Sequence, residues 1–331
     1  GRFENPKNPQ QLEQPEQPKK PDLHKGDTMD NSMRQQHMFR REYFGKGLST
    51  LCGGFLVVLT IAIGCFLLAK GMLSFTTFDH SIGEFLFSSV WKPSDTEAGG
   101  GQIGAAIYIW GSILTCLTAL VIAVPFSLST AIFMTQISPK LGEKLIRPAV
   151  EIFVGIPSVV YGWVGLVVLV PLIQKVFDRS HGQSVLAAAI VLSVMIYPTI
   201  TSVSADAIRS VNKKYIEGAY GLGSTRWQMI YKVLLPAAMS GILTAIVLGL
   251  ARAFGEALAV SMVIGKMRAF PHSLLDPTNN LTAAIASDMG GAMDGGEFNA
   301  ALWSMALLLF IVSLLFILII HLIAARKEKI A

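Results

Sequence analysis

Hydrophobic residues in this chain gather in six long blocks that are separated by shorter polar segments. The blocks cover about 48–70, 105–134, 148–174, 184–205, 237–264 and 301–324. Each is at least as long as the run of about 18 apolar residues that marks a membrane-crossing helix. The pattern therefore predicts an all-α integral membrane protein with six transmembrane helices.

Composition supports the same fold class. Of the 331 residues, 52% are hydrophobic and only 15% are charged, whereas soluble domains carry about 25% charged residues. The three cysteines, Cys52, Cys65 and Cys116, all fall within apolar blocks. They have neither a disulfide pattern nor metal-ligand spacing, so we expect small buried hydrophobic residues and no metal site.

The first 45 residues form a polar tail. Up to about Asp22 they are rich in Pro, Gln, Glu, Asn and Lys, and such a segment cannot bury enough apolar surface to fold. We expect a disordered tail at 1–45, a membrane domain at 46–325 and a short basic end at 326–331. A signal peptide is not expected, because the first apolar block starts near Leu48, too far into the chain.

The lysines and arginines near the span ends predict the orientation, since cytoplasmic segments carry more of them. If the N-terminus is cytoplasmic, the inner segments hold fifteen such residues and the outer segments five. The inner residues are Arg34, Arg40, Arg41, Lys46, Lys140, Lys144, Arg147, Arg209, Lys213, Lys214, Arg226, Lys232, Arg326, Lys327 and Lys329, and the outer ones are Lys92, Lys175, Arg179, Lys266 and Arg268. Both termini and the polar stretch 217–236 are thus predicted to be cytoplasmic.

Prolines interrupt the second, third and fourth apolar blocks. They are Pro125, Pro157 and Pro198, each close to a hydroxyl side chain (Ser127, Ser158 and Thr199). Proline removes a backbone hydrogen bond and kinks a helix, and broken membrane helices often line transport paths. An ordinary packing kink is the alternative for each proline alone. Taken together they predict broken spans, with Ser158 and Thr199 on a polar path.

Arg252 and Glu256 are charged residues inside the fifth block. They follow Pro236 by 16 and 20 residues, which is about 24 and 30 Å along a helix. A membrane arginine is costly and needs a partner or water. At spacing i, i+4 the two side chains share a helix face and can pair. The alternatives are a structural ion pair and an arginine that handles an anion, for which a guanidinium offers several fixed donors.

The stretch 217–236 reads EGAYGLGSTRWQMIYKVLLP. Apolar residues recur at helical intervals on both sides of Gly223, which breaks the pattern, and Pro236 closes it. This predicts two short amphipathic helices joined at a glycine, with a proline at the start of the next helix. From composition alone, such a segment is most often interfacial.

The spacing within this stretch resembles the EAA motif of ABC importer permeases. The matching positions are Glu217, Gly218, Ala219, Gly223, Val233, Leu235 and Pro236, with Gly218 in place of alanine and Val233 in place of isoleucine. The resemblance implies a type I ABC importer permease fold with cytoplasmic coupling helices. It also implies that the loop 214–236 docks a separate ATPase subunit, through Glu217, Gly218, Ala219, Gly223, Leu235 and Pro236.

Two further segments narrow the resemblance. GIPSVVYG at 155–162 and LGLARAFGE at 248–256 are similar to segments of the Pst phosphate importer permeases, the PstC type in particular, and the similarity covers about 45–325. It implies a bacterial cell membrane and phosphate passage at Arg252 and Glu256. It also implies a second, PstA-like permease, a PstB-like ATPase dimer and an extracellular PstS-like phosphate-binding protein.

The sequence predicts a transport subunit rather than an enzyme. It has no GxxxxGK[ST] phosphate-binding loop, so we expect no cofactor of its own and ATP bound by the partner subunit. An intramembrane hydrolase is disfavoured because Ser158 has no evident histidine partner. The acidic segment 288–297, DMGGAMDGGE, lacks the spacing of a calcium loop and is expected to be solvated.

Three alternatives remain open at this point. The chain could be the PstA-type sister subunit, or a permease for another oxyanion such as sulfate or molybdate. It could also be a stand-alone secondary transporter, for which broken helices and a membrane arginine fit equally well. The pattern in 217–236 argues against the last, because a stand-alone carrier has no ATPase to dock.

Overall fold

The computed structural model describes residues 26–96 and 98–328. The chain divides into two compact units, 1–62 and 63–331, and each is described by itself. The described part of the first unit is the N-terminal portion of helix α1, Gly26–Gly71. Helix α1 thus includes residues 26–45 of the expected tail, whose Met, Gln, Glu and Arg residues favour helix. Residues 1–25 of that tail, and residues 329–331 of the basic end, lie outside the described residues.

In the part of the chain that the structure describes, six helical runs are long and apolar enough to cross a membrane, so the predicted six-span, all-α class is confirmed. They are Gly45–Thr76, Ala106–Ile137, Ser158–Val176, Val185–Arg209, Arg226–Gly255 and Glu297–Leu318. Two differ from the predicted blocks. The third begins at Ser158 rather than near 148, and the fifth runs from Arg226 to Gly255 rather than from about 237 to 264.

The spans are built from several helical pieces. The first contains α1 from Gly45 onward and α2 (Leu73–Thr76), and the second contains α4 (Ala106–Ile132) and η1 (Phe133–Ile137). The third contains α7 (Ser158–Val164), η3 (Gly165–Leu169) and α8 (Val170–Val176), and the fourth is α9 (Val185–Arg209). The fifth contains α11 (Arg226–Met229), η4 (Ile230–Leu234) and α12 (Leu235–Gly255), and the sixth lies in α15 (Glu297–Glu328).

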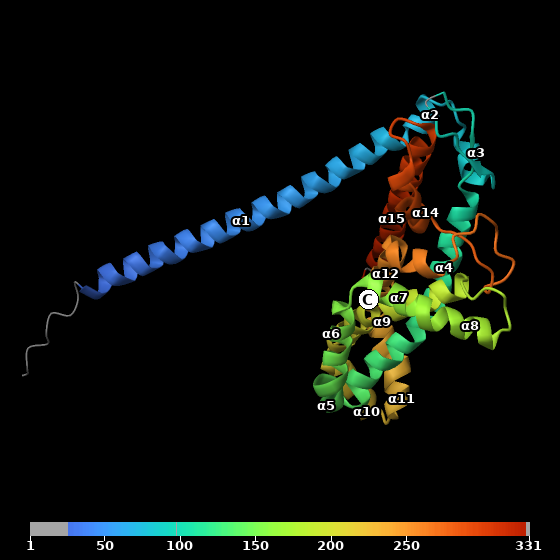
Figure 1. Ribbon diagram of the computed structural model, residues 1–331. Coiled ribbons are helices and arrows are strands. Elements are labelled where there is room, and N and C mark those ends of the chain that lie inside the picture. Colours follow the sequence, from blue (N-terminus) through green and yellow to red (C-terminus); the bar gives the residue numbers. More distant parts are fainter. Residues whose placement is uncertain (1–25, 97, 329–331) are drawn as a thin grey trace, which may run out of the picture. The chain divides into compact units, whose positions relative to one another are not determined.

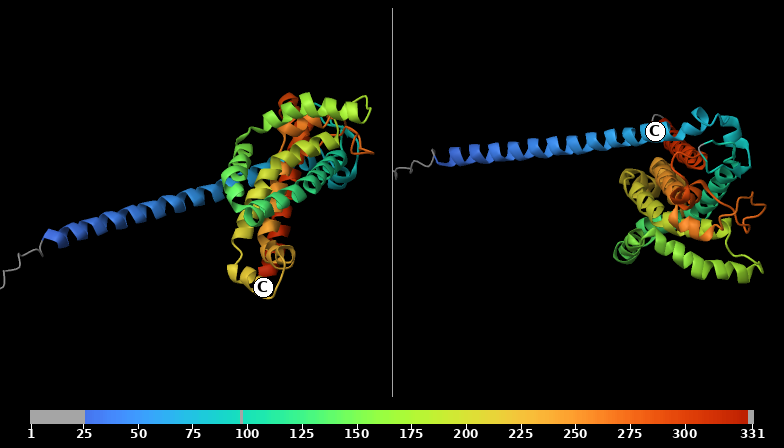
Figure 2. Two further views of the ribbon diagram at one scale, coloured as in Figure 1. Left: turned by 90° about the horizontal axis from the view of Figure 1, so that it is seen from below. Right: turned by 45° about the horizontal axis from the view of Figure 1, so that its top comes forward.

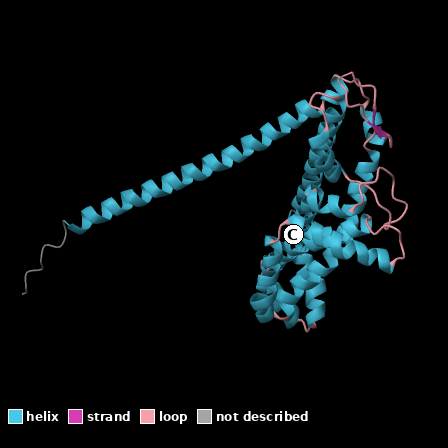
Figure 3. Ribbon diagram, viewed as in Figure 1, coloured by secondary structure: helices cyan, strands magenta, loops and turns pink. Residues whose placement is uncertain are grey.

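Shorter elements connect these runs. They are α3 (Ile82–Phe87), α5 (Pro139–Leu141), η2 (Gly142–Ile146), α6 (Arg147–Gly155), α10 (Lys213–Gly221), α13 (Leu258–Val263), α14 (Leu281–Asp288) and the 3₁₀ turn η5 (Met289–Gly291). In the described residues the strands are confined to one antiparallel hairpin (Figure 3), β1 (Trp91–Lys92) with β2 (Gln102–Ile103), in which Trp91 pairs with Ile103.

Each π-helical segment that the structure describes is followed by one further residue and then by a proline. Segments η1, η2, η3 and η4 are followed by Ser138-Pro139, Arg147-Pro148, Val170-Pro171 and Leu235-Pro236. In each, the residue before the proline donates its N–H to the carbonyl five positions back, as from Leu235 to Ile230. Proline has no N–H and crowds the carbonyl four residues earlier. The wider π turn relieves that crowding without ending the helix.

Only one of the three predicted proline interruptions breaks a helix. Ile156 and Pro157 are extended, with ψ of 128° and 141°, between α6 and α7. Pro125 and Pro198 instead lie within the continuous helices α4 and α9. Those two helices pack closely on each other, and Ser127 Oγ donates to Tyr197 O at 3.2 Å. The two helices thus contact each other near their prolines and stay continuous, although each proline removes one backbone hydrogen bond.

The core of the second unit is formed where α4, α9 and α12 pack together (Figures 1 and 2). Small residues allow this approach: a Cβ on Gly249 of α12 would lie 2.7 Å from the Ile200 side chain of α9. Close contact at small residues is how membrane helices associate. Elements α5, α10 and α11 lie at one end of this unit, and α2 and α3 lie at the other (Figure 1).

Candidate functional site

Arg252 lies in the last turn of α12, far from Pro236 along the fifth span, as predicted. Its guanidinium donates a hydrogen bond to Thr199 Oγ1 of α9 at 3.1 Å, and both residues are half-buried. The structure therefore brings together two residues that the sequence assigned to the path. Among the described residues, no carboxylate forms an ion pair with Arg252, so its charge is not neutralised there by the chain.

The expected pairing of Arg252 with Glu256 is wrong. An i, i+4 pair requires a helix that continues through both residues, but α12 ends at Gly255 and Glu256 is extended, with ψ of 118°. Glu256 Oε1 instead accepts a hydrogen bond from Ala259 N at 2.9 Å, at the start of α13. Its backbone carbonyl accepts one from Thr282 Oγ1 at 2.8 Å. Glu256 thus stabilises the interruption between α12 and α13, close to Arg252 in the chain.

Ser158 is the first residue of α7, directly after the break at Pro157. The helix it begins packs on α13: a Cβ on Gly162 would lie 2.7 Å from Ala259 Cα. The two breaks therefore lead into neighbouring short helices. Tyr161, which the sequence analysis did not single out, donates from its hydroxyl to Phe153 O at 2.8 Å and so bridges the break at Pro157.

The polar stretch 217–236 forms two short helices joined at a glycine, as predicted. Asn212 caps α10, and Gly223 takes a φ of +78° in the turn that follows, a conformation that favours glycine. Thr225 and Gln228 form a reciprocal capping box at the start of α11. Helix α11 then continues through η4 into α12, so Pro236 lies near the start of α12 but within a continuous helical run.

The stretch has one face toward the spans and one face outward. Ala219, Met229, Ile230 and Leu234 are buried in a cluster with residues of α4 and α9. Glu217, Gly218, Gly223 and Pro236 are exposed, and Leu235 is half-buried. Leu222 is 90% exposed and Trp227 63% exposed. Exposed large apolar side chains beside polar ones are typical of a protein interaction surface.

A buried carboxylate that the sequence analysis assigned to a solvated loop lies at the other end of the unit. Glu297 is fully buried. It accepts hydrogen bonds from Ser94 N at 2.6 Å and Gly101 N at 2.9 Å, and its Oε1 lies 2.6 Å from His80 Nε2. A carboxylate with this many partners fixes the start of α15 to the segment 80–101, which contains α3 and β1. Residues so distant in sequence gave no local signal of the contact.

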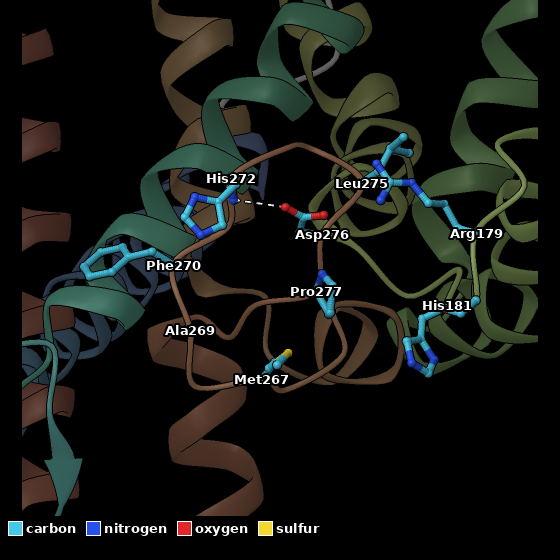
Figure 4. A pocket seen from close by; sticks show the side chains of 10 residues that line it. Arg179, His181, Met267, Ala269, Phe270, His272, Leu275, Asp276 and Pro277 are labelled. Atoms are coloured by element: carbon cyan, nitrogen blue, oxygen red, sulfur yellow. Dashed lines mark hydrogen bonds between the residues drawn. The ribbon is translucent and has the colours of Figure 1, made fainter.

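A cavity of about 430 Å³ opens between the loop that follows α8 and the loop that follows α13 (Figure 4). Arg179, His181 and His272 line it, and Asp276 accepts hydrogen bonds from the backbone N–H groups of His272 and Ser273 at 3.0 and 2.9 Å. By alternation of the spans, these loops lie on the side of the membrane opposite to the 217–236 stretch.

Comparisons with known proteins agree with this architecture. Residues 123–329 match the family model described as "Binding-protein-dependent transport system inner membrane component". The chain is 47% identical over 287 residues to a probable ABC transporter permease protein, YqgH, of Bacillus subtilis (strain 168), covering 87% of this chain and 92% of the relative. It is 35% identical over 294 residues to the phosphate transport system permease protein PstC of Pasteurella multocida (strain Pm70), covering 83% and 89%.

The fold is also found in a solved structure. A chain of a bacterial alginate ABC transporter, solved with its alginate-bound periplasmic protein, superposes with a TM-score of 0.58 at 16% identity, covering 89% of this chain and 99% of that one. The six spans and this neighbour give the chain the type I ABC importer permease fold. The chain is a multi-pass membrane transport component, and it belongs to the family of binding-protein-dependent transport system inner membrane components.

Proposed function

We propose that this chain is the transmembrane permease subunit of an ATP-driven importer of inorganic phosphate, PstC-like, and that it forms half of the translocation path. The observation that carries the proposal is Arg252. It lies within a membrane span, donates to the neutral hydroxyl of Thr199 and forms no ion pair among the described residues. A guanidinium that keeps its charge and has several donors in a fixed fork can bind a tetrahedral oxyanion.

Phosphate is the substrate that the relatives favour. The Pasteurella relative is named as a phosphate transport system permease, and relatives of the same name from Haemophilus influenzae and Xylella fastidiosa are 32% identical. Sulfate or molybdate has the same tetrahedral shape, so a permease for one of these oxyanions is the alternative. A PstA-type assignment is the other alternative, and a stand-alone secondary transporter is disfavoured by the family.

The partners follow from the same proposal. A second, PstA-like permease completes the path, and an extracellular PstS-like protein delivers phosphate. A PstB-like ATPase dimer binds ATP and docks on the exposed face of the 217–236 stretch, so the chain needs no cofactor. Docking there places both termini in the cytoplasm of a bacterial cell, consistent with the excess of lysine and arginine on that side.

The test is uptake by the complex reconstituted in liposomes. We expect ATP-dependent uptake of radiolabelled phosphate that excess sulfate does not inhibit. Arg252→Gln is expected to abolish uptake while the subunits remain assembled, and Arg252→Lys to retain only part of it, because an ammonium lacks the fixed fork of donors. Preferred uptake of sulfate would show that sulfate, and not phosphate, is the substrate. Unchanged uptake by Arg252→Gln would show that the arginine takes no part in the path.

A further inference from the structure

Arg226 connects the 217–236 stretch to the second span. It is the first residue of α11, and its guanidinium reaches the end of η1, where the helical run that began at Ala106 stops. There it donates hydrogen bonds to Gln136 O and, at 3.1 Å, to Ile137 O. Arg226 is thus directed toward its own chain rather than outward.

The chemistry of this contact is that of a helix C-terminus. The last carbonyls of a helix have no partner within the helix and carry partial negative charge. A cation placed there is favourable, and a guanidinium can donate to two carbonyls at once, which one ammonium does not do with the same geometry. Both hydrogen bonds come from one nitrogen, Nη2, so the contact depends on a cation with N–H donors at this position.

Apolar packing reinforces the same connection. Met229, Ile230 and Leu234, which follow Arg226 on α11 and η4, are buried with Ala131 of α4 and Met134 of η1. The side chains of Leu222 and Trp227 remain exposed on the outward side. A displacement applied to the outward side is thereby transmitted to α4 through hydrogen bonds and packing, and to α12 through the continuous helix.

We infer that Arg226 is a positioning residue that makes the second span move with the 217–236 stretch. The inference rests on the proposed function, because it assigns a route for movement that the docked ATPase would drive. The fifth span, which carries Arg252, moves with the stretch because the helix from Arg226 to Gly255 is continuous. The second span, which packs on α9 and contacts Tyr197, two residues before Thr199, is moved through Arg226.

The test compares three variants of the reconstituted complex, with ATP hydrolysed per solute molecule transported as the readout. Arg226→Ala is expected to keep the ATPase subunits bound and hydrolysing ATP while that ratio rises at least about tenfold. Arg226→Lys is expected to give a smaller rise, of about threefold, because its ammonium keeps the charge and the N–H donors but not the length and planarity of the guanidinium. Lys140→Ala is the matched control, since Lys140 is an exposed cation of α5 beside η1 and outside the stretch, and it should keep the wild-type ratio.

Two results would overturn the inference. A wild-type ratio in Arg226→Ala would show that the contact transmits nothing, and loss of the ATPase subunits from an otherwise stable complex would assign Arg226 to docking instead. If the complex with Arg226→Ala does not assemble, the ratio of ATP hydrolysed to solute transported is measured in Arg226→Lys, and a wild-type value there would overturn the inference. Transport of sulfate in place of phosphate by the wild type would contradict the proposed substrate only, because the ratio can be measured with sulfate.

Discussion

Arg252 donates its hydrogen bond to Thr199, 53 residues earlier in the chain, rather than to Glu256, four residues later. The contact joins α12 to α9 in the interior of the spans. It leaves the charge of Arg252 balanced only by a hydroxyl dipole, among the residues that the structure describes. The arginine is therefore held in place without being neutralised, as an anion-binding group requires.

Thr199→Val is expected to lower uptake at least about tenfold, because loss of a hydrogen bond to a charged group costs about 1.5–3 kcal/mol. Arg252 then loses the contact that orients it. Uptake of radiolabelled phosphate at several concentrations measures the effect. Thr199→Ser keeps the hydroxyl and is the matched control, so wild-type uptake in Thr199→Val, or a loss in Thr199→Ser alone, would show that the hydrogen bond does not matter.

Glu217→Lys is expected to weaken the interaction with the ATPase while the fold persists, since Glu217 is exposed on α10. Co-purification of the ATPase subunit and its stimulated hydrolysis are the two measurements. Glu84→Lys makes the same charge change at an exposed site in α3, at the other end of the unit. Normal recruitment and stimulation in Glu217→Lys would contradict docking at this residue.

Glu297→Ala is expected to lower the free energy of unfolding by about 3 kcal/mol, because the N–H groups of Ser94 and Gly101 and the ring of His80 lose a buried acceptor. Thermal unfolding of the purified complex in detergent measures this. Glu297→Gln retains one acceptor oxygen and should fall between the wild type and Glu297→Ala. A melting temperature equal to the wild type in Glu297→Ala would refute a stabilising role for this cluster.

Two glycine substitutions are expected to have opposite effects. Gly218 is helical, and a Cβ at this position would have no neighbouring atom within 4 Å, so Gly218→Ala should be tolerated and stabilise α10 by about 0.5–1 kcal/mol. A Cβ on Gly111 of α4 would instead collide with Asn279 O, so Gly111→Ala should lower the yield of folded protein. Size-exclusion profiles and melting temperatures of both variants check this, and equal behaviour would contradict it.

The sequence predicts most of what depends on local pattern. The six spans follow from apolar blocks, and the helix–glycine–helix form of 217–236 follows from its periodicity and Gly223. Pro157 interrupts its predicted block, whereas Pro125 and Pro198 lie in continuous helices that pack on each other, and a single sequence does not display that packing. The burial of Glu297 was missed for the same reason, since its partners lie about 200 residues earlier.

The π turns that precede the prolines also set the rotational phase of the spans. A π turn accommodates one extra residue, and each residue of an α-helix advances the side-chain direction by about 100°. The turn at η4 therefore offsets the helix face presented by Trp227 from the face that directs Arg252 toward Thr199. Counting residues in steps of 3.6 from one to the other consequently gives the wrong face, whereas removing a single residue from η4 would convert the π turn into an α turn and leave the direction of Arg252 unchanged.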